Sequence, residues 1–169
     1  LEALKKQIPL SIAAYARAVP GMSKRLLKEI ETGKEATGAD PKNLAALALK
    51  GVAQPGDFDD IFRAFQGSAG QRILNRNLAE TLGSIAPFLR GPQRTNAMKS
   101  LTDYLGKRDP AQQVSQRMLR GRLPRPVMNE IEGELDKQVA AANPKANVCD
   151  TICGIFDKAE EWGGVANTD

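Results

Sequence analysis

The sequence has no histidine, only two cysteines, and few aromatic residues: five Phe, two Tyr and one Trp in 169 positions. Histidine is the usual general base and the commonest metal ligand in proteins, so its absence leaves chemistry to carboxylates, Lys, Tyr, Arg and the two thiols. This absence argues against a hydrolase, a metalloenzyme or any other enzyme. We expect no metal ion, no cofactor and no small-molecule substrate.

The sequence also lacks an apolar run near the roughly 20 residues that a membrane-spanning helix requires, and no signal peptide is recognisable. Cys149 and Cys153 lie four residues apart, one helical turn. Two thiols without further Cys or His make a poor zinc site, and such a pair is usually reduced and buried among apolar residues. We therefore expect a soluble chain in a reducing compartment, with Cys149 as a candidate nucleophile only if its thiol is reactive.

Apolar residues recur at helical spacing, and no segment of five or more residues alternates with a period of two. The pattern predicts an all-α fold, a compact orthogonal or irregular bundle of about nine or ten mostly short helices. A chain of this length has room for one domain with a real core. We interpret residues 1–169 as a single helical domain excised from a larger protein, because the sequence begins at Leu1 rather than Met.

The segment 57–67 has the sharpest helical pattern. Phe58, Ile61, Phe62 and Phe65 stand at i, i+3, i+4 and i+7, so they share one face of a helix. Asp57 is suited to cap its first turn. Three of the five phenylalanines lie here, so we expect the other helices to pack around this one.

The net charge of +4 conceals a strong asymmetry along the chain. Residues 1–60 carry 9 basic and 8 acidic side chains, residues 61–128 carry 12 and 3, and residues 129–169 carry 3 and 9. The central excess is almost entirely arginine, which binds phosphate and carboxylate in a bidentate manner. A basic middle and an acidic end indicate an acidic partner, or an interaction of the two regions with each other.

The arginines of this region are the candidate partner-binding residues, because a cluster of them would form a positive surface. The alternatives are an ordinary solvated face, partly neutralised by the acidic helix over 129–142, and the binding of an anionic membrane or a nucleic acid. Nucleic-acid binding usually brings aromatic residues for stacking, and here we assign Phe88 and Tyr104 to the core. The candidates are Arg72, Arg76, Arg90, Arg94, Arg117, Arg120, Arg122 and Arg125.

The segment Phe88–Thr95, Phe-Leu-Arg-Gly-Pro-Gln-Arg-Thr, resembles the arginine-finger loop of bacterial Rho GTPase-activating toxins, in which a Leu-Arg precedes a Thr in a helical domain. The resemblance covers these eight residues. It implies that Arg90 would stabilise charge on a transferring phosphoryl group. Those toxins add a Gln-Trp-Gly segment, whereas Trp162 follows Glu161 and lies 72 residues beyond Arg90.

The sequence is therefore interpreted as a non-catalytic helical protein–protein interaction domain that binds an acidic protein surface through its arginines. Its alanine-rich helices suggest a domain of a secreted bacterial effector, a virulence factor delivered into a host cell. The alternatives are an enzyme or GTPase regulator that uses Arg90 as a finger or the thiol of Cys149, and a binder of anionic membrane or nucleic acid.

Overall fold

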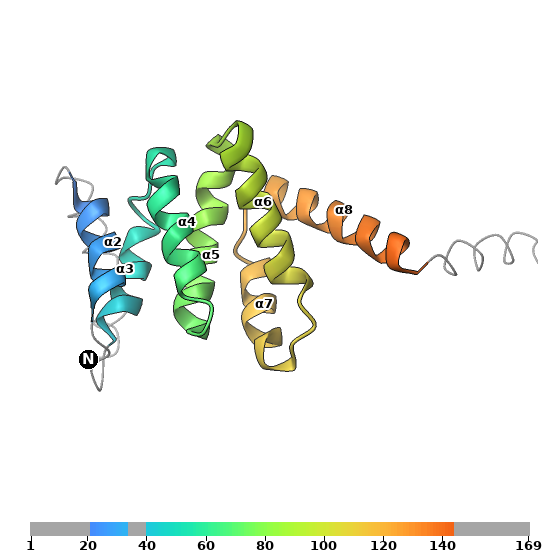
Figure 1. Cartoon of the computed structure of the whole chain (residues 1–169), viewed down its shortest axis with the longest axis horizontal. Coiled ribbons are helices and arrows are strands. Elements are labelled where there is room, and N and C mark those ends of the chain that lie inside the picture. Colours follow the sequence, from blue (N-terminus) through green and yellow to red (C-terminus); the bar gives the residue numbers. More distant parts are fainter. Residues whose placement is uncertain (1–20, 34–39, 144–169) are drawn as a thin grey trace, which may run out of the picture. The chain divides into compact units, whose positions relative to one another are not determined.

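All regular structure in the computed structural model, which describes residues 21–33 and 40–143, is helical (Figure 1). The α-helices of these ranges are α2 (Met22–Thr32), α3 (Pro41–Leu49), α4 (Phe58–Gly67), α5 (Arg72–Ile85), α6 (Gly91–Gly106), α7 (Gln113–Arg120) and α8 (Arg125–Ala142). Three short 3-10 helices join them: η1 (Pro55–Asp57), η2 (Ala86–Phe88) and η3 (Pro110–Gln112).

The all-α prediction is confirmed for the described residues, whereas the count of nine or ten helices is not matched, since these residues contain seven α-helices. The helical patterns of the sequence over 1–19 and 148–162 lie outside the described residues. The sequence predicts a short helical turn over 84–90 that Pro87 interrupts; in the structure Ser84 and Ile85 complete α5, and the turn is the 3-10 helix η2 that follows.

By its contacts the chain divides into two units, residues 1–131 and 132–169, and α8 crosses the boundary. The prediction of one domain over 1–169 stays a prediction. In the first unit, α8 buries Val127, Met128 and Ile131. In the second, Val139 of α8 is 56% exposed, so this part of the helix does not bury the apolar stripe that the sequence suggested.

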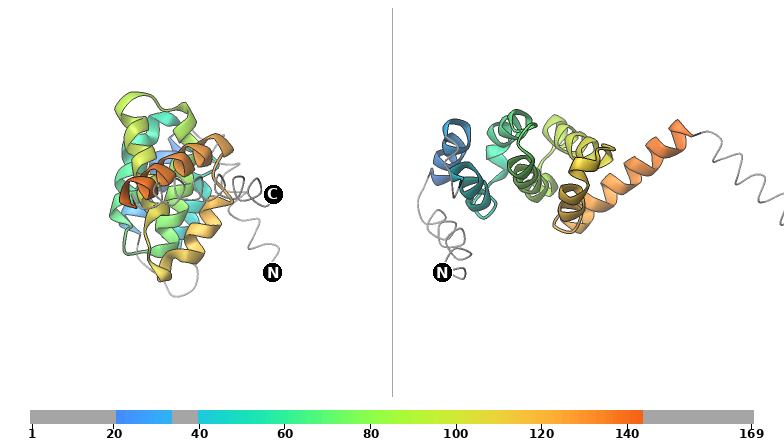
Figure 2. Two further views of the ribbon diagram at one scale, coloured as in Figure 1. Left: turned by 90° about the vertical axis from the view of Figure 1, so that its right-hand side faces the viewer. Right: turned by 90° about the horizontal axis from the view of Figure 1, so that it is seen from below.

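Within the first unit, three successive helix pairs lie side by side: α2 with α3, α4 with α5, and α6 with α7 (Figure 1). The first helices of the pairs form one layer and the second helices form another (Figure 2, right). In the second layer α5 packs against α3 on one side and α7 on the other. This layer brings together residues that are distant in the sequence.

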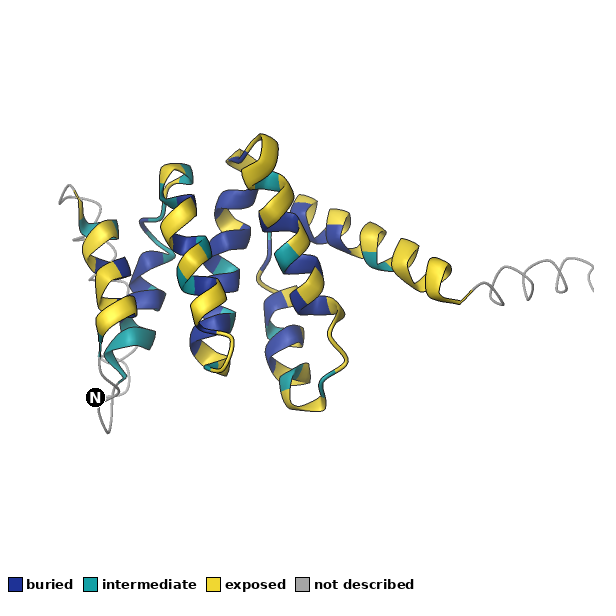
Figure 3. Ribbon diagram, viewed as in Figure 1, coloured by how far each residue is buried: buried dark blue, intermediate teal, exposed yellow. Residues whose placement is uncertain are grey.

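The central helix of the first unit is α5, which packs against α3, α4, α6 and α7 and is dark over most of its length in Figure 3. Leu123 lies so close to Gly83 that a side-chain carbon on the glycine would overlap it. Gly83 lies within α5 rather than at its end, and it lets the segment after α7 approach this helix. The buried residues of α5 are Leu74, Asn75, Asn77, Leu78, Ala79, Thr81, Leu82, Gly83 and Ile85.

The phenylalanine helix, α4, is part of the core but is not its centre. Phe58, Ile61 and Phe65 are buried, and Phe62 is half-buried with its ring stacked on Phe58 at a centroid distance of 5.3 Å. Asp57 does not cap α4 with its side chain; its carboxylate accepts a hydrogen bond from the backbone N–H of Gln54 at 3.0 Å, within η1. The expectation that the other helices surround α4 is therefore wrong, because they surround α5.

No helix among those described combines the length and apolar character needed to cross a membrane.

Replacing Gly83 with Ala tests the contact with Leu123. The added methyl group must displace a buried side chain, so we expect the free energy of unfolding to fall by about 1–3 kcal/mol in urea denaturation. Gly133→Ala is the matched control: no atom lies within 4 Å of the added carbon there, so this change should raise the free energy of unfolding by about 0.5–1 kcal/mol. Equal stabilisation by both changes would contradict the packing described here.

Candidate protein-interaction surface

The eight predicted arginines fall into two groups that differ in their contacts within the fold. Four of them make hydrogen bonds or ion pairs to other helices, and four have no such partner among the described residues. The first group is Arg76, Arg94, Arg120 and Arg122. The second group, called the free arginines below, is Arg72, Arg90, Arg117 and Arg125, and all four are exposed.

Two arginines of the first group occupy helix C-termini. Arg94 donates to the carbonyl of Ala86 after α5 at 3.3 Å, and Arg120 donates to the carbonyl of Leu105 in α6 at 3.4 Å. The last carbonyls of a helix lack intrahelical donors and carry partial negative charge, so a guanidinium is favourable there. Arg94 also pairs with Glu130 of α8 at 2.6 Å. These side chains are thus occupied in joining helices.

The only acidic side chain of α5, Glu80, is also occupied. Its Oε2 accepts from Lys50 Nζ at 2.9 Å and from Arg122 Nη1 at 3.4 Å. Lys50 follows α3 and Arg122 follows α7, so this carboxylate links the three helices of the second layer. Its Oε2 therefore already compensates two positive charges.

Three of the free arginines lie where a positive charge is unfavourable. Arg72 is the first residue of α5, Arg90 precedes the first residue of α6, and Arg125 is the first residue of α8. The first turns of these helices contain no acidic residue. Because a helix N-terminus carries partial positive charge, each such arginine costs a few tenths of a kcal/mol to about 1 kcal/mol. An anion bound beside them would remove this repulsion.

Exposed apolar residues of α5 and α7 lie one turn before a contact between the two helices. Arg76 Nη1 of α5 contacts Met118 Sδ of α7 at 3.2 Å. Ile73 precedes Arg76 by three residues and Val114 precedes Met118 by four, and the two helices run in the same direction (Figure 1). Each of these apolar residues therefore lies one turn from the contact, on neighbouring helices.

The helical periodicity of the sequence groups Ile73 and Val114 with the apolar residues of their helices, yet their side chains are 52% and 71% exposed. Helical periodicity does not distinguish a core-facing stripe from a partner-facing one. Arg72 lies next to Ile73 in the chain, and Arg117 lies three residues after Val114, on the same side of α7. We call Arg72, Ile73, Arg76, Val114 and Arg117 the α5–α7 face.

The phenol of Tyr104 interacts electrostatically with Arg76 of this face. The phenol of Tyr104, on α6, is buried, and its oxygen makes no hydrogen bond of acceptable geometry. Burial raises the pKa of Tyr104 from 10.0, while the charge of Arg76 and the hydroxyl of Ser115 act less strongly in the opposite direction. Arg76 is thus partly committed to the interior, and its Nε is buried without a hydrogen-bond partner.

Of the two low-priority catalytic candidates, only Arg90 lies in the part of the chain that the structure describes. Arg90 is exposed and precedes α6, and the described residues place no ion pair or hydrogen bond on its side chain. Cys149 lies outside the described residues. Phe88, two residues before Arg90, is 71% exposed, so its assignment to the core is wrong, whereas Tyr104 is buried as expected. No group of three or more His, Cys, Asp or Glu in the described ranges could hold a metal ion.

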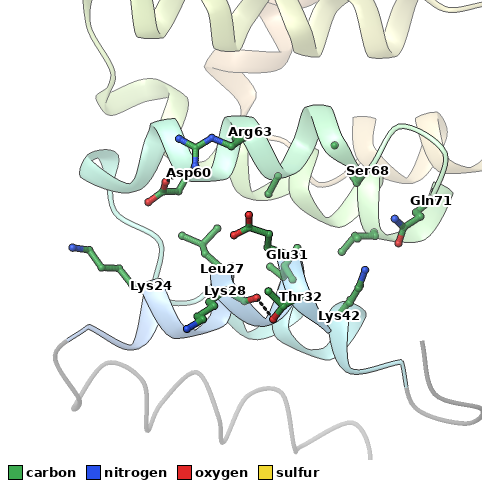
Figure 4. A pocket seen from close by; sticks show the side chains of 14 residues that line it. Lys24, Leu27, Lys28, Glu31, Thr32, Lys42, Asp60, Arg63, Ser68 and Gln71 are labelled. Atoms are coloured by element: carbon green, nitrogen blue, oxygen red, sulfur yellow. Dashed lines mark hydrogen bonds and ion pairs between the residues drawn. The ribbon is translucent and has the colours of Figure 1, made fainter. Parts of the chain in front are cut away.

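A separate cavity of about 690 Å³ lies between α2 and α4, and the sequence did not indicate it. Its base is apolar, with Leu27 and Leu74 among its residues, and its rim is charged with both signs. Figure 4 shows Glu31 pointing from α2 toward α4, whereas Lys24 and Lys28 point away from the space between the two helices. The charges do not converge on one point, so the cavity favours neither an anion nor a cation.

No protein-family model matches the chain, and neither curated proteins nor solved structures show significant similarity to it.

The position of Arg72 at a helix N-terminus predicts an unusual effect of reversing its charge. Arg72→Glu should raise the free energy of unfolding by about 0.3–1 kcal/mol at low salt, because the carboxylate complements the helix dipole. The matched control is Arg117→Glu, in the last turn of α7, which should lower it by a similar amount. Urea denaturation of both variants tests this. A lower free energy of unfolding in both variants would contradict an unfavourable interaction of Arg72 with the dipole of α5.

Tyr104→Phe tests the buried phenol. Below pH 10 the phenol is neutral in both the folded and the unfolded chain. As the pH rises from 10 through the raised pKa of the folded state, the unfolded chain loses the phenol proton first, so the free energy of unfolding falls. We expect the variant to be as stable as the parent chain or slightly more so at pH 7, because the buried hydroxyl is unpaired. Above pH 10 the variant should become the more stable of the two. Urea denaturation of both chains at pH values from 7 to 11 measures the difference in their free energy of unfolding. A difference that stays constant with pH would mean that the phenol is solvated.

Proposed function

We propose that the chain is a non-catalytic helical module that binds an acidic protein surface through its free arginines. One observation carries this proposal: two of the three carboxylates in the basic region already have partners within the fold, while four exposed arginines have none. Residues 61–128 contain Glu80, Asp103 and Asp109. Glu80 is held by Lys50 and Arg122, and Asp109 accepts a hydrogen bond from the N–H of Ala111 at 2.9 Å.

The choice of arginine supports a protein or phosphate partner over simple solubility. Lysine and arginine both keep a surface charged, but arginine loses less conformational freedom for each hydrogen bond it forms with a carboxylate. Ten of the twelve basic residues in 61–128 are arginine. The three arginines at helix N-termini also lower the stability of the free chain, an arrangement found where function outweighs local stability.

An acidic protein is favoured over a nucleic acid because the α5–α7 face carries aliphatic rather than aromatic side chains. Single-stranded nucleic acids gain affinity by stacking bases on aromatic rings. The described residues expose one large aromatic side chain, Phe88, and it belongs to η2, not to this face. The delivery of the module into a host cell as part of a secreted bacterial effector stays a prediction.

The proposal is tested with a labelled oligoglutamate peptide of about 18 residues, followed by fluorescence anisotropy at low and near-physiological salt. The double change Arg72→Glu and Arg117→Glu should weaken binding by about tenfold or more, because charge-assisted hydrogen bonds become repulsions. Arg120 is left unchanged, since it caps α6 and its loss would disturb the fold. Circular dichroism should show unchanged helicity.

The matched control is Lys99→Glu with Arg108→Glu, which makes the same change in net charge at two exposed positions that are not part of the α5–α7 face. It should weaken binding far less. Equal losses in both double variants would mean that net charge alone attracts the peptide. Polyuridine RNA, duplex DNA and anionic vesicles are measured in parallel, and tight binding of one of them that survives salt would overturn the proposal.

A further inference from the structure

The α5–α7 face combines charge with exposed apolar surface, and charge alone does not account for it. Ile73 and Val114 are two of the four large apolar side chains that are exposed among the described residues; the others are Phe88 and Val139. Single exposed apolar residues are common on proteins. Here two of them lie one turn from the same contact, Arg76–Met118, on helices that pack against each other. We call Ile73 and Val114 the apolar strip of this face.

Positive charge borders this strip on both helices. Arg72 precedes Ile73 at the start of α5, and Arg117 follows Val114 by one turn on α7. Two of the three carboxylates in residues 61–128, those of Glu80 and Asp109, already accept hydrogen bonds within the fold. A partner that fits this arrangement must therefore present an apolar stripe with carboxylates on its two sides.

We propose that the α5–α7 face binds an acidic amphipathic helix of another protein. The apolar stripe of this helix covers Ile73 and Val114, and its carboxylates pair with Arg72 and Arg117. This inference rests on the proposed function and names the partner's chemistry. An amphipathic helix presents apolar residues at i, i+3, i+4 and i+7 with polar residues on either side, the pattern that the strip and its arginines complement.

The guanidinium of Arg76 gives the site a fixed centre. It is held against Met118 between the two helices, with its Nε buried. An arginine that is already ordered loses little side-chain entropy when a carboxylate arrives, so it binds more effectively than a mobile one. The flexible arginines at 72 and 117 then act as outer contacts, and the apolar strip excludes water beside them.

Three labelled peptides of 18 residues test the inference on the full 169-residue chain. The first is an amphipathic helix with Leu at i, i+3, i+4 and i+7 and mainly Glu elsewhere; the second has the same composition in scrambled order; the third is oligoglutamate. Burial of two aliphatic side chains should make the first bind about tenfold or more tightly than the second. This advantage should persist at high salt, because apolar contacts are not screened.

The variant Ile73→Ser with Val114→Ser should remove the advantage of the first peptide and leave binding of oligoglutamate unchanged. Phe88→Ser is the matched control, since it removes a larger exposed apolar side chain from η2, and should preserve the advantage. All three positions are more than half exposed, so thermal unfolding should show a folded chain in each case.

Two results would overturn this inference while leaving the proposed function intact. One is equal binding of the amphipathic and scrambled peptides; the other is an equal effect of the strip variant and Phe88→Ser. In either case the Arg72→Glu and Arg117→Glu variant would still weaken oligoglutamate binding. If no acidic peptide binds the parent chain, the proposed function itself fails, and this inference fails with it.

Discussion

The burial of α5 is the constraint on which the first unit depends. This helix contacts α3, α4, α6 and α7, so its side chains must satisfy neighbours on nearly every side. Gly83 is bare because Leu123 occupies the space of a side chain. Asn75 donates to the carbonyl of Phe65 and to the hydroxyl of Ser68, at 2.9 and 3.0 Å, and so joins the start of α5 to the end of α4. Only one exposed stripe of α5 remains available to a partner.

The arginines show how one residue type divides between structure and binding. Where the guanidinium meets a C-terminal carbonyl or a carboxylate of another helix, it stabilises the fold, as Arg94 and Arg122 do. Where it meets a helix N-terminus, as at Arg72, it opposes the dipole and weakens the fold. Arginines without a partner in the fold, such as Arg72 and Arg117, gain most from an anionic partner. Arginine side chains therefore join helices at some positions, and at others they leave positive charge on the surface without a partner.

The role of an exposed apolar residue depends on the residues around it. Phe88 and Val114 are equally exposed, yet they differ in surroundings. Val114 lies one turn from the Arg76–Met118 contact, as Ile73 does, and Arg117 follows it by one turn on α7, whereas Phe88 lies in the short η2 turn. Apolar burial supplies affinity that salt does not screen, and arginine supplies orientation. A surface that joins the two is suited to an amphipathic acidic helix.

The sequence by itself determined the helical class of the described residues, the buried face of α4 and the excess of arginine in 61–128. These follow from local periodicity and composition, which depend on near neighbours in the chain. Only the tertiary structure decided that α5 is the central helix, that Ile73 and Val114 are exposed, and which arginines are free. A residue such as Arg94 is occupied because Ala86 and Glu130 reach it from other elements. Such pairings depend on how the helices pack, and helical spacing alone carries no information about them.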